Sequence, residues 1–186
     1  IACNTATARA LKEANEKYDL PIIGVIEAGA KTAAYTTKNK IVGVIGTDGT
    51  IRSKAYNIEI AKIDPEIKIV DKACPLFVPI VEEGWANTDI ASLTAKRYLE
   101  ELMDKGIDSL VLGCTHYPFV RDSIKKVVGH EIAIIDGGEG TVREIKRRLK
   151  EKNLLTNRAT KGEISIYNSL EEQKVIDLSL KLIERK

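Results

Sequence analysis

Residues 109–116 read SLVLGCTH, a short apolar run that ends in a small residue, a cysteine and polar residues. Similar apolar runs recur along the chain and alternate with longer segments in which apolar residues have helical spacing. This alternation is typical of repeated βα units, and strands that are apolar throughout are covered on both faces. The sequence therefore predicts an α/β fold with a mostly parallel sheet flanked by helices.

The other elements follow from the same pattern on either side of the strand at 109–112. Further strands are predicted at residues 21–25, 41–45, 67–70, 132–135 and 163–167. Helices are predicted at residues 5–17, 53–62, 88–105, 119–128, 141–152 and 169–184. The clearest helix is 88–105, because its apolar residues share one side and Gly106 is placed to end it.

Composition and charge exclude several classes of protein. The chain has 186 residues, of which 44% are hydrophobic and 30% charged, the balance of a globular protein. A formal net charge of +2 gives no reason to expect a nucleic-acid partner. No stretch approaches the roughly 20 apolar residues of a membrane span, so no membrane partner is expected. The three cysteines are widely separated, which fits a reducing compartment, and we expect a cytoplasmic protein.

Two of the cysteines occupy similar settings. Cys3 and Cys114 each follow an apolar segment where a strand gives way to a helix. Parallel α/β folds bind ligands at the carboxyl ends of strands, and a helix N-terminus lowers the pKa of a thiol from its usual ~8.5. The pattern favours two reactive thiols and suggests two similar α/β lobes; the alternative is a pair of small buried residues. Cys74 lies between a proline and apolar residues, which favours an inert, packed thiol.

A histidine lies two residues after the second of these cysteines. His116 could shuttle protons or orient a substrate beside Cys114. Cys-x-His occurs once, without a second cluster at zinc-binding spacing, and no glycine-rich phosphate motif is present. We therefore expect neither a metal ion nor a nucleotide or other cofactor.

Two segments resemble the signatures of a known enzyme family. Residues 1–6, IACNTA, and residues 113–118, GCTHYP, are similar to the two cysteine motifs of glutamate racemases. Further similar segments, in the family's order and spacing, are PIIGVIE at 21–27, IGT at 45–47, CPLFVP at 74–79 and VEEG at 81–84. The resemblance extends from residue 1 to about residue 150.

The resemblance implies a cofactor-independent isomerase that interconverts L- and D-glutamate by two-base proton transfer. Cys3 would deprotonate D-glutamate and Cys114 L-glutamate, since a single base returns its proton to the face from which it came. His116 would assist Cys114, and Glu82 corresponds to a carboxylate of the family's site. The resemblance also implies a homodimer that supplies D-glutamate for peptidoglycan, and so for cell-wall biogenesis and cell shape.

Substrate-binding residues are implied by the same resemblance. Hydroxyls, side-chain amides and the backbone N–H groups of helix N-termini would hold the carboxylates of glutamate. The residues are Asn4, Thr5, Thr47, Thr115 and His116.

The family's fold has two α/β lobes with the active site between them. By the resemblance the first lobe would hold residues 1–26 and 136–186, and the second residues 27–135. The family's chain starts earlier, with Asp-Ser-Gly and Pro-Tyr-Gly segments that do not occur here. We therefore expect that an N-terminal portion is absent, and that these 186 residues alone have little or no racemase activity.

Other functions stay open at this point. The chain could be an aspartate or hydantoin racemase of the same superfamily, although Thr115 and His116 favour glutamate. It could instead be a thiol hydrolase with Cys114 as nucleophile and His116 as base. A binding domain without enzymatic activity is the remaining alternative.

Overall fold

The computed structural model describes residues 1–167, 169, 173, 176, 177, 179 and 180. The chain divides into two compact units, Ile1–Asn153 and Leu154–Lys186. The strands and helices named below all belong to the first unit. Most of the helix predicted at 169–184 lies outside the described residues, and the division into two lobes stays a prediction.

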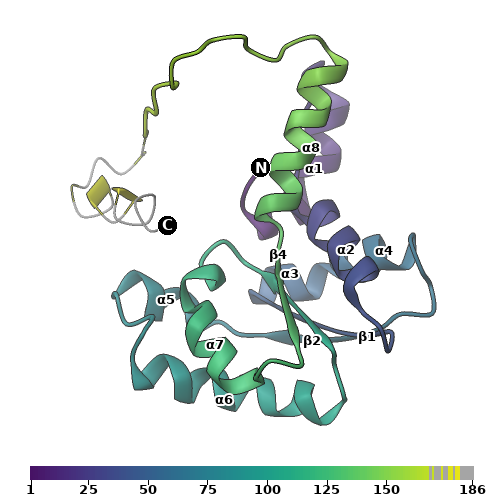
Figure 1. Ribbon diagram of the computed structural model, residues 1–186, viewed down its shortest axis with the longest axis vertical. Coiled ribbons are helices and arrows are strands. Elements are labelled where there is room, and N and C mark those ends of the chain that lie inside the picture. The colour runs from purple at the N-terminus through teal and green to yellow at the C-terminus, as the bar shows by residue number, and fades with distance from the viewer. Residues whose placement is uncertain (168, 170–172, 174–175, 178, 181–186) are drawn as a thin grey trace. The chain divides into compact units, whose positions relative to one another are not determined.

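Four parallel strands form one sheet in the described part of the chain (Figure 1). They are β1 (Ile41–Gly46), β2 (Lys68–Ala73), β3 (Ser109–Gly113) and β4 (Ala133–Asp136), in the spatial order β2-β1-β3-β4. The α/β class and the strands predicted at 41–45, 67–70, 109–112 and 132–135 are confirmed. Because all four strands run in the same direction, their carboxyl ends meet at one edge of the sheet.

One face of the sheet is covered by α2 (Val25–Thr36) and α4 (Ala55–Ala61). Val42, Val44 and Val111 belong to the buried cluster on this face, together with residues of both helices. Val42 and Val44 are two positions apart on β1 and therefore point to the same face, because successive side chains of a strand point to opposite faces.

The other face is covered by α5 (Phe77–Glu82), α6 (Asp89–Asp104) and α7 (Arg121–Val128). Ile45 and Leu112 are fully or almost fully buried in the cluster on this side. Burial on both faces explains why the strands read as continuous apolar runs.

The remaining helical elements are α1 (Asn4–Lys17), α3 (Asp48–Ser53), the 3₁₀ turn η1 (Tyr117–Val120) and α8 (Gly138–Glu151).

Most predicted helices are confirmed to within three residues at each end. The helix predicted at 53–62 is α4, which begins at Ala55 and is preceded by the separate, unpredicted helix α3. Lys54 between them has a φ of 55°, a left-handed conformation that ends α3 before α4 begins.

The strand predicted at 21–25 is wrong. Residues 21–24 have no regular structure, and α2 begins at Val25 after Gly24 as its N-cap. A strand needs a ladder of partners, whereas the hydrogen bond found at this segment in the described part of the chain runs from the Ile1 nitrogen to the Ile23 carbonyl oxygen, at 2.5 Å. Gly24 passes close to α1, since a Cβ there would lie 2.3 Å from Cγ2 of Thr7.

The strand predicted at 163–167 is also wrong. These residues have no regular structure, and their side chains are exposed. Strand propensity reflects packing on a half-buried surface, and none of these five side chains is buried.

Three short or small-residue helices were not predicted. The sequence of α2, VIEAGAKTAAYT, has alanine and glycine where an apolar stripe usually has large side chains. The helix α5 contains Pro79, which its first turn tolerates because the amide groups there have no partner within the helix. Short helices such as α3 leave only a weak periodic signal.

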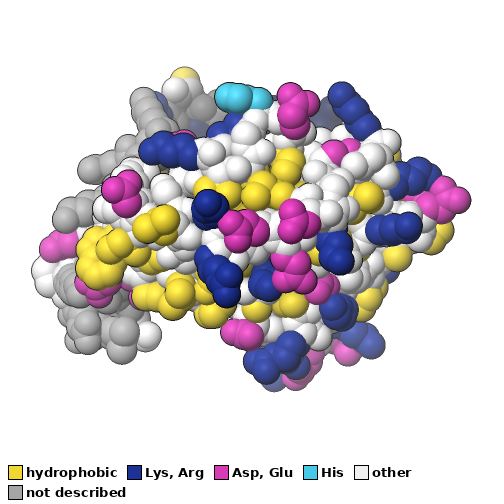
Figure 2. All heavy atoms as spheres, turned by 90° about the horizontal axis from the view of Figure 1, so that it is seen from below, with side chains coloured by type: hydrophobic (Ala, Val, Ile, Leu, Met, Phe, Trp, Pro, Cys, Tyr) yellow, Lys and Arg dark blue, Asp and Glu magenta, His cyan; other side chains and the backbone are white. Residues whose placement is uncertain are grey.

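The surface carries charges of both signs. Figure 2 shows acidic and basic side chains interspersed over the face that it displays, with hydrophobic side chains between them. None of the described helices is both long and apolar enough to cross a membrane.

Candidate active site

The predicted site residues lie around the carboxyl edge of the sheet. Thr47 follows β1, and Cys114 follows β3. The N-terminal end of α1, with Cys3 as its N-cap, is tied to the same edge by a 2.7 Å hydrogen bond between the hydroxyls of Thr5 and Thr47. The structure thus brings the two cysteine motifs to one edge, although 111 positions separate them in the sequence.

Cys3 is exposed and lies at a helix N-terminus. Its sulfur accepts a hydrogen bond from the backbone N–H of Ala6 at 3.5 Å. Backbone N–H groups at this position carry the positive end of the helix dipole.

Cys114 is buried, with 7% of its surface exposed. Burial raises the pKa of its thiol, the backbone N–H of His116 lowers it, and a charge on Cys3 raises it further. The net pKa is raised. Because a negative charge on Cys3 raises the pKa of Cys114, ionisation of one thiol disfavours ionisation of the other.

His116 lies between Cys114 and Glu82. Its Nδ1 is 3.9 Å from Sγ of Cys114, and its Nε2 is 3.2 Å from Oε1 of Glu82. The hydroxyl of Thr115 lies 3.5 Å from the same Nδ1. A carboxylate that accepts from Nε2–H leaves Nδ1 unprotonated in the neutral imidazole, so that this nitrogen can accept the thiol proton. Three residues predicted to be catalytic are therefore in contact.

Three threonine hydroxyls form a triangle at the ends of β1 and α1. The hydroxyl of Thr5 lies 2.7 Å from that of Thr47 and 3.0 Å from that of Thr50, and Thr47 and Thr50 are 3.1 Å apart. Thr50 was not predicted. The available signal was its position three residues after Thr47, the spacing at which an N-cap side chain accepts from a backbone N–H.

Asn4 is 5% exposed, and its side-chain oxygen accepts a 2.8 Å hydrogen bond from the hydroxyl of Tyr56. Tyr56 was also not predicted as part of the site. The two residues are 52 positions apart, so no local pattern could join them.

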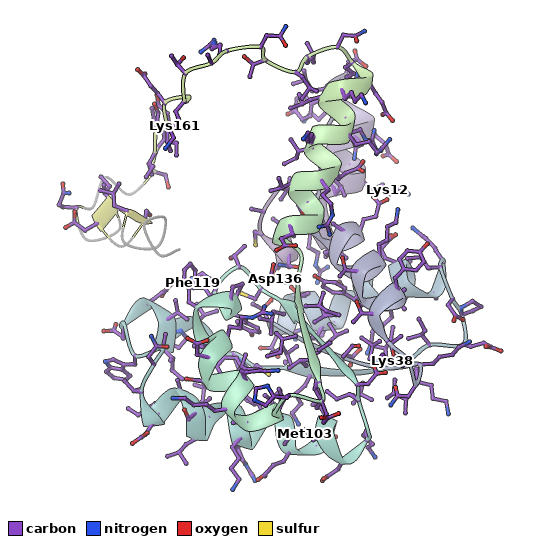
Figure 3. The ribbon with its side chains drawn as sticks, viewed as in Figure 1. Lys12, Lys38, Met103, Phe119, Asp136 and Lys161 are labelled. Carbon is purple, nitrogen blue, oxygen red and sulfur yellow. The ribbon has the colours of Figure 1, made fainter. Side chains whose placement is uncertain are left out.

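The edge continues at the end of β4, where Figure 3 labels Asp136. Its carboxylate pairs with Arg121 at 3.1 Å and accepts a 3.0 Å hydrogen bond from the backbone N–H of Gly138, in the first turn of α8. This carboxylate is thus already bound by the protein's own donors.

A cavity of about 720 Å³ lies elsewhere, between α1, α2, α8 and residues 21–24. Leu11, Ile22, Tyr35 and Arg143 are among its lining residues, and neither Cys3 nor Cys114 is. We assign the site to the cysteines, because two thiols and an imidazole come together there, whereas the described residues that line this cavity include neither cysteine nor histidine.

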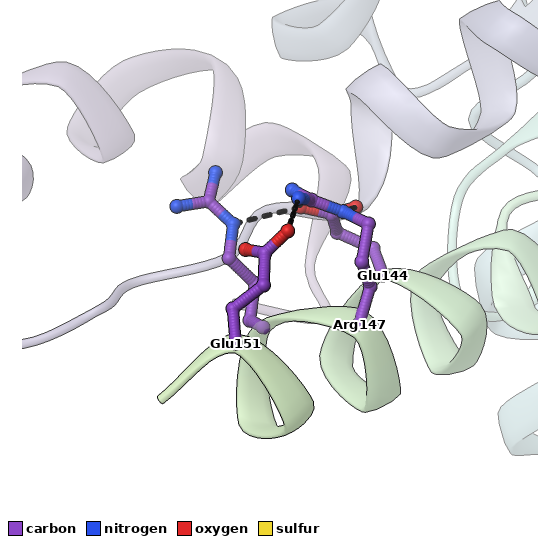
Figure 4. A network of polar contacts seen from close by, with 4 residues as sticks. Glu144, Arg147 and Glu151 are labelled. Carbon is purple, nitrogen blue, oxygen red and sulfur yellow. Dashed lines mark hydrogen bonds and ion pairs between the residues drawn. The ribbon is translucent and has the colours of Figure 1, made fainter. Parts of the chain in front are cut away.

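The arginines of α8 are paired with glutamates of their own helix, as Figure 4 shows for Arg147. Glu144 accepts hydrogen bonds from Arg147 at 2.6 Å and from Arg148 at 2.8 Å, and Arg147 also donates to Glu151 at 2.5 Å. These hydrogen bonds lower the pKa of Glu144 to about 2. Arg147 and Arg148 are thus part of a charge-paired helix face.

Cys74 is fully buried, and burial raises the pKa of its thiol to about 12. A thiol of this kind stays protonated at neutral pH. Within the described ranges, no group of three histidine, cysteine or acidic side chains is arranged to hold a metal ion.

Comparison with known proteins places the chain in a family. Residues 1–145 match the family model described as Asp/Glu/Hydantoin racemase. The glutamate racemase of Geobacter metallireducens is 47% identical over 162 residues, which is 87% of this chain and 60% of that protein. The glutamate racemase of Sulfurihydrogenibium sp. is 40% identical over 190 residues, 99% of this chain and 71% of that protein.

Solved structures agree with this placement. The glutamate racemase isoform RacE1 from Bacillus anthracis superposes with a TM-score of 0.80 at 39% identity, over 83% of this chain and 58% of that one. The glutamate racemase from Francisella tularensis, solved in complex with D-glutamate, gives a TM-score of 0.78 at 38% identity, over 84% of this chain and 58% of that one.

The chain spans 60% of the length of the Geobacter protein. The match covers both cysteine motifs and all four strands of the sheet. On this match and on its identity to several glutamate racemases, the chain belongs to the Asp/Glu/Hydantoin racemase family.

Proposed function

We propose that this protein is a glutamate racemase that inverts the α-carbon of glutamate between Cys3 and Cys114. The observation that carries the proposal is the contact of Cys114, His116 and Glu82 at the edge where α1 presents Cys3. The names of the relatives support glutamate as the substrate, and one solved relative was crystallised with D-glutamate.

The reaction in the L-to-D direction starts with a Cys114 thiolate and a Cys3 thiol. The Cα–H bond of L-glutamate breaks and its proton forms an S–H bond with Cys114, which leaves a carbanion on Cα. The S–H bond of Cys3 then breaks, and its proton adds to the opposite face of Cα. An L-to-D turnover therefore ends with a Cys114 thiol and a Cys3 thiolate, which is the starting state of the reverse reaction.

His116 and Glu82 allow the thiol of Cys114 to ionise. Burial raises the pKa of this thiol, so a base must take its proton before the sulfur can act. The imidazole Nδ1, 3.9 Å from the sulfur, supplies that base, and Glu82 stabilises the imidazolium that results.

The hydroxyl triangle and Asn4 supply hydrogen-bond donors for the carboxylates. Negative charge moves onto the α-carboxylate when the proton leaves Cα, and preorganised donors stabilise that charge. Thr5, Thr47 and Thr50 lie within 3.1 Å of one another, which concentrates three rotatable O–H groups at one point. Thr115 beside His116 supplies a further hydroxyl.

The proposal also covers the location, oligomeric state, role and cofactor requirement of the enzyme. We infer that the enzyme is a cytoplasmic homodimer that supplies D-glutamate for peptidoglycan, and that it needs no pyridoxal phosphate, metal ion or nucleotide. The two cysteines themselves provide the acid and the base that a cofactor would otherwise assist. Exhaustive dialysis with a chelator should leave racemisation intact, and activity that is lost and then restored by an added cofactor would contradict this part.

A thiol hydrolase is the second candidate, since Cys114, His116 and Glu82 have the order of a nucleophile, a base and an orienting carboxylate. The presence of a second thiol, Cys3, at the same edge disfavours it, because a hydrolase with one nucleophile needs only one thiol. A hydrolase would release the alcohol of an activated ester in a burst equal to the enzyme concentration, as the acyl group is transferred to the sulfur of Cys114, and water would then release the acyl product.

The deciding assay uses the intact gene product with L-glutamate, D-glutamate and L-aspartate in separate reactions. Circular dichroism should show that both glutamate enantiomers converge to zero ellipticity. In deuterated water the product enantiomer should carry deuterium at Cα. Racemisation of aspartate or a hydantoin without glutamate would replace the proposed substrate, and acyl release without inversion would replace the reaction.

A further inference from the structure

Tyr56 is a buried tyrosine whose hydroxyl reaches into the candidate site. Its ring is wedged between α2 and β3, since a Cβ on Gly29 would lie 3.1 Å from its hydroxyl oxygen and one on Gly113 would lie 3.1 Å from its Cε2. Only 2% of Tyr56 is exposed. The ring therefore has little freedom to move, and its hydroxyl has a fixed position beside the N-terminal end of α1.

The hydroxyl donates to the side-chain oxygen of Asn4 at 2.8 Å. Burial raises the pKa of Tyr56, and nearby Asp136 and Cys114 raise it further, so the hydroxyl keeps its proton at any working pH. The oxygen of a primary amide accepts and its nitrogen donates, and in the orientation found the Asn4 oxygen faces Tyr56. The flipped amide would take this acceptor away from the buried Tyr56 proton, which favours the orientation found.

The selected orientation leaves the Asn4 nitrogen on the opposite side of the amide carbon. Within the part of the chain that the structure describes, no hydrogen bond to Nδ2 of Asn4 is found, although the residue is 95% buried. A buried amide nitrogen without a partner is unfavourable, and bound substrate would satisfy it. Asn4 is the first residue of α1 and lies between Cys3 and Thr5 in the sequence.

We propose that Tyr56 is a positioning residue for substrate binding, because it holds the Asn4 amide with both N–H donors available to a substrate carboxylate. Tyr56 does not touch the substrate and acts only through Asn4. The inference rests on the proposed function, in which a substrate carboxylate binds at the N-terminal end of α1.

The test compares Tyr56→Phe with Asn4→Ala and with the double variant in the intact gene product. Tyr56→Phe removes one oxygen and leaves the packing of the ring in place. We expect the KM of the substrate to rise about tenfold with a smaller change in kcat, since the amide is then free to flip and loses most of one binding interaction. Asn4→Ala should raise KM at least as much.

The double variant distinguishes a positioning role from a structural one. If Tyr56 acts through Asn4, then adding Tyr56→Phe to Asn4→Ala should change KM by less than about twofold. If the KM of the double variant rises by the product of the two single-variant factors, Tyr56 acts independently of Asn4. That result would overturn the proposal.

Tyr117→Phe is the matched control. Tyr117 is also fully buried, and its hydroxyl donates at 2.8 Å to the backbone carbonyl of Cys74. This variant should lower the thermal midpoint and leave KM unchanged. A Tyr56→Phe variant that behaves in the same way, with lower stability and normal KM, would mean that Tyr56 only packs.

Failure of the proposed function has a separate signature. KM is measured with whichever substrate the unmodified protein racemises, so activity on aspartate alone would refute glutamate and still test Tyr56. A second readout needs no substrate: the side-chain amide signals of Asn4 in a ¹⁵N-labelled NMR spectrum. Tyr56→Phe should shift these signals and Tyr117→Phe should not; signals unmoved by Tyr56→Phe would contradict the proposal.

Discussion

Glu82 and His116 are 34 positions apart in the chain, and the structure places Oε1 of Glu82 3.2 Å from Nε2 of His116. The contact joins α5 to the loop after β3, and it aims the other imidazole nitrogen at Cys114. A carboxylate in this position fixes the tautomer of the imidazole. Glu82 thus contacts Cys114 only through His116.

The first prediction concerns Glu82→Gln. Loss of the carboxylate should lower kcat/KM about 10- to 100-fold, as is common when a catalytic imidazole loses its orienting group. The decrease must be equal for both enantiomers, because L- and D-glutamate have the same free energy. The measurement is the initial rate of racemisation in each direction.

Glu83→Gln is the control for this change. Glu83 is the neighbouring exposed glutamate, so its replacement makes the same change in charge and volume one residue away. A comparable loss of activity in both variants would point to the local charge and away from the Glu82–His116 contact.

The second prediction concerns the order in which the thiols react. Iodoacetamide alkylates thiolates, and a raised pKa reduces the thiolate fraction at a given pH. Cys3 is exposed, burial raises the pKa of Cys114, and the pKa of the fully buried Cys74 is about 12. Mass spectrometry of the alkylated chain at pH 8 should show the rate order Cys3, Cys114, Cys74.

The pH dependence of these rates follows from the same shifts. At pH 8 a thiol with a pKa of 12 is ionised to only about one part in 10⁴. The alkylation rates of Cys114 and Cys74 should therefore still rise about tenfold per pH unit above pH 8, until each pKa is reached. Faster alkylation of Cys114 than of Cys3 at pH 8 would mean that burial does not control its ionisation.

The sheet could be predicted from the sequence because its strands are buried on both faces. Runs such as residues 41–45 and 110–112 contain no polar side chain, as is typical of strands covered on both faces. The prediction failed at 21–25, where an equally apolar segment runs beside α1 without a ladder. Apolar composition indicates burial, and only partners at hydrogen-bonding distance make a strand.

The site was predictable where residues lie close together in the sequence. Cys114 and His116 are two positions apart, so their contact follows from one motif, and Glu82 came from the resemblance to a family. Tyr56 and Thr50 were missed because their contacts with Asn4 and Thr5 span 52 and 45 positions. Contacts over such separations depend on the tertiary fold, which places α1 beside α3 at the end of β1.

The third prediction concerns the space beside the candidate site. A Cβ on Gly113 would lie 2.7 Å from the backbone oxygen of Ile45, which cannot move without disturbing the sheet. Gly113→Ala should therefore lower the free energy of unfolding by about 2–3 kcal/mol, as overpacking of a rigid core does. Urea denaturation of the chain measures the change.

Gly43→Ala provides the comparison within the same sheet. A Cβ on Gly43 would also approach within 2.7 Å of another atom, but that atom is Cδ1 of Ile107, the end of a flexible side chain. We expect a cost of about 1 kcal/mol or less, because a rotamer change relieves the contact. Equal costs for the two variants would show that the backbone near Gly113 adapts as easily as a side chain.

The central claim is that Cys3 and Cys114 each serve one face of the α-carbon, and single serine variants of the intact gene product test it most directly. Serine is a far poorer base than a thiolate, so each variant keeps one working base. The substrate is glutamate with a chloride on its β-carbon, which is eliminated after proton abstraction even when inversion is lost. Cys74→Ser, at the buried thiol, is the control and should process both enantiomers.

The measurement is chloride release from the L and D forms of this substrate by each variant. Cys3→Ser should release chloride from the L form and not from the D form, and Cys114→Ser should show the opposite preference, while both variants lose racemisation of glutamate. Equal residual release from both enantiomers in both variants would contradict the assignment of one cysteine to each face.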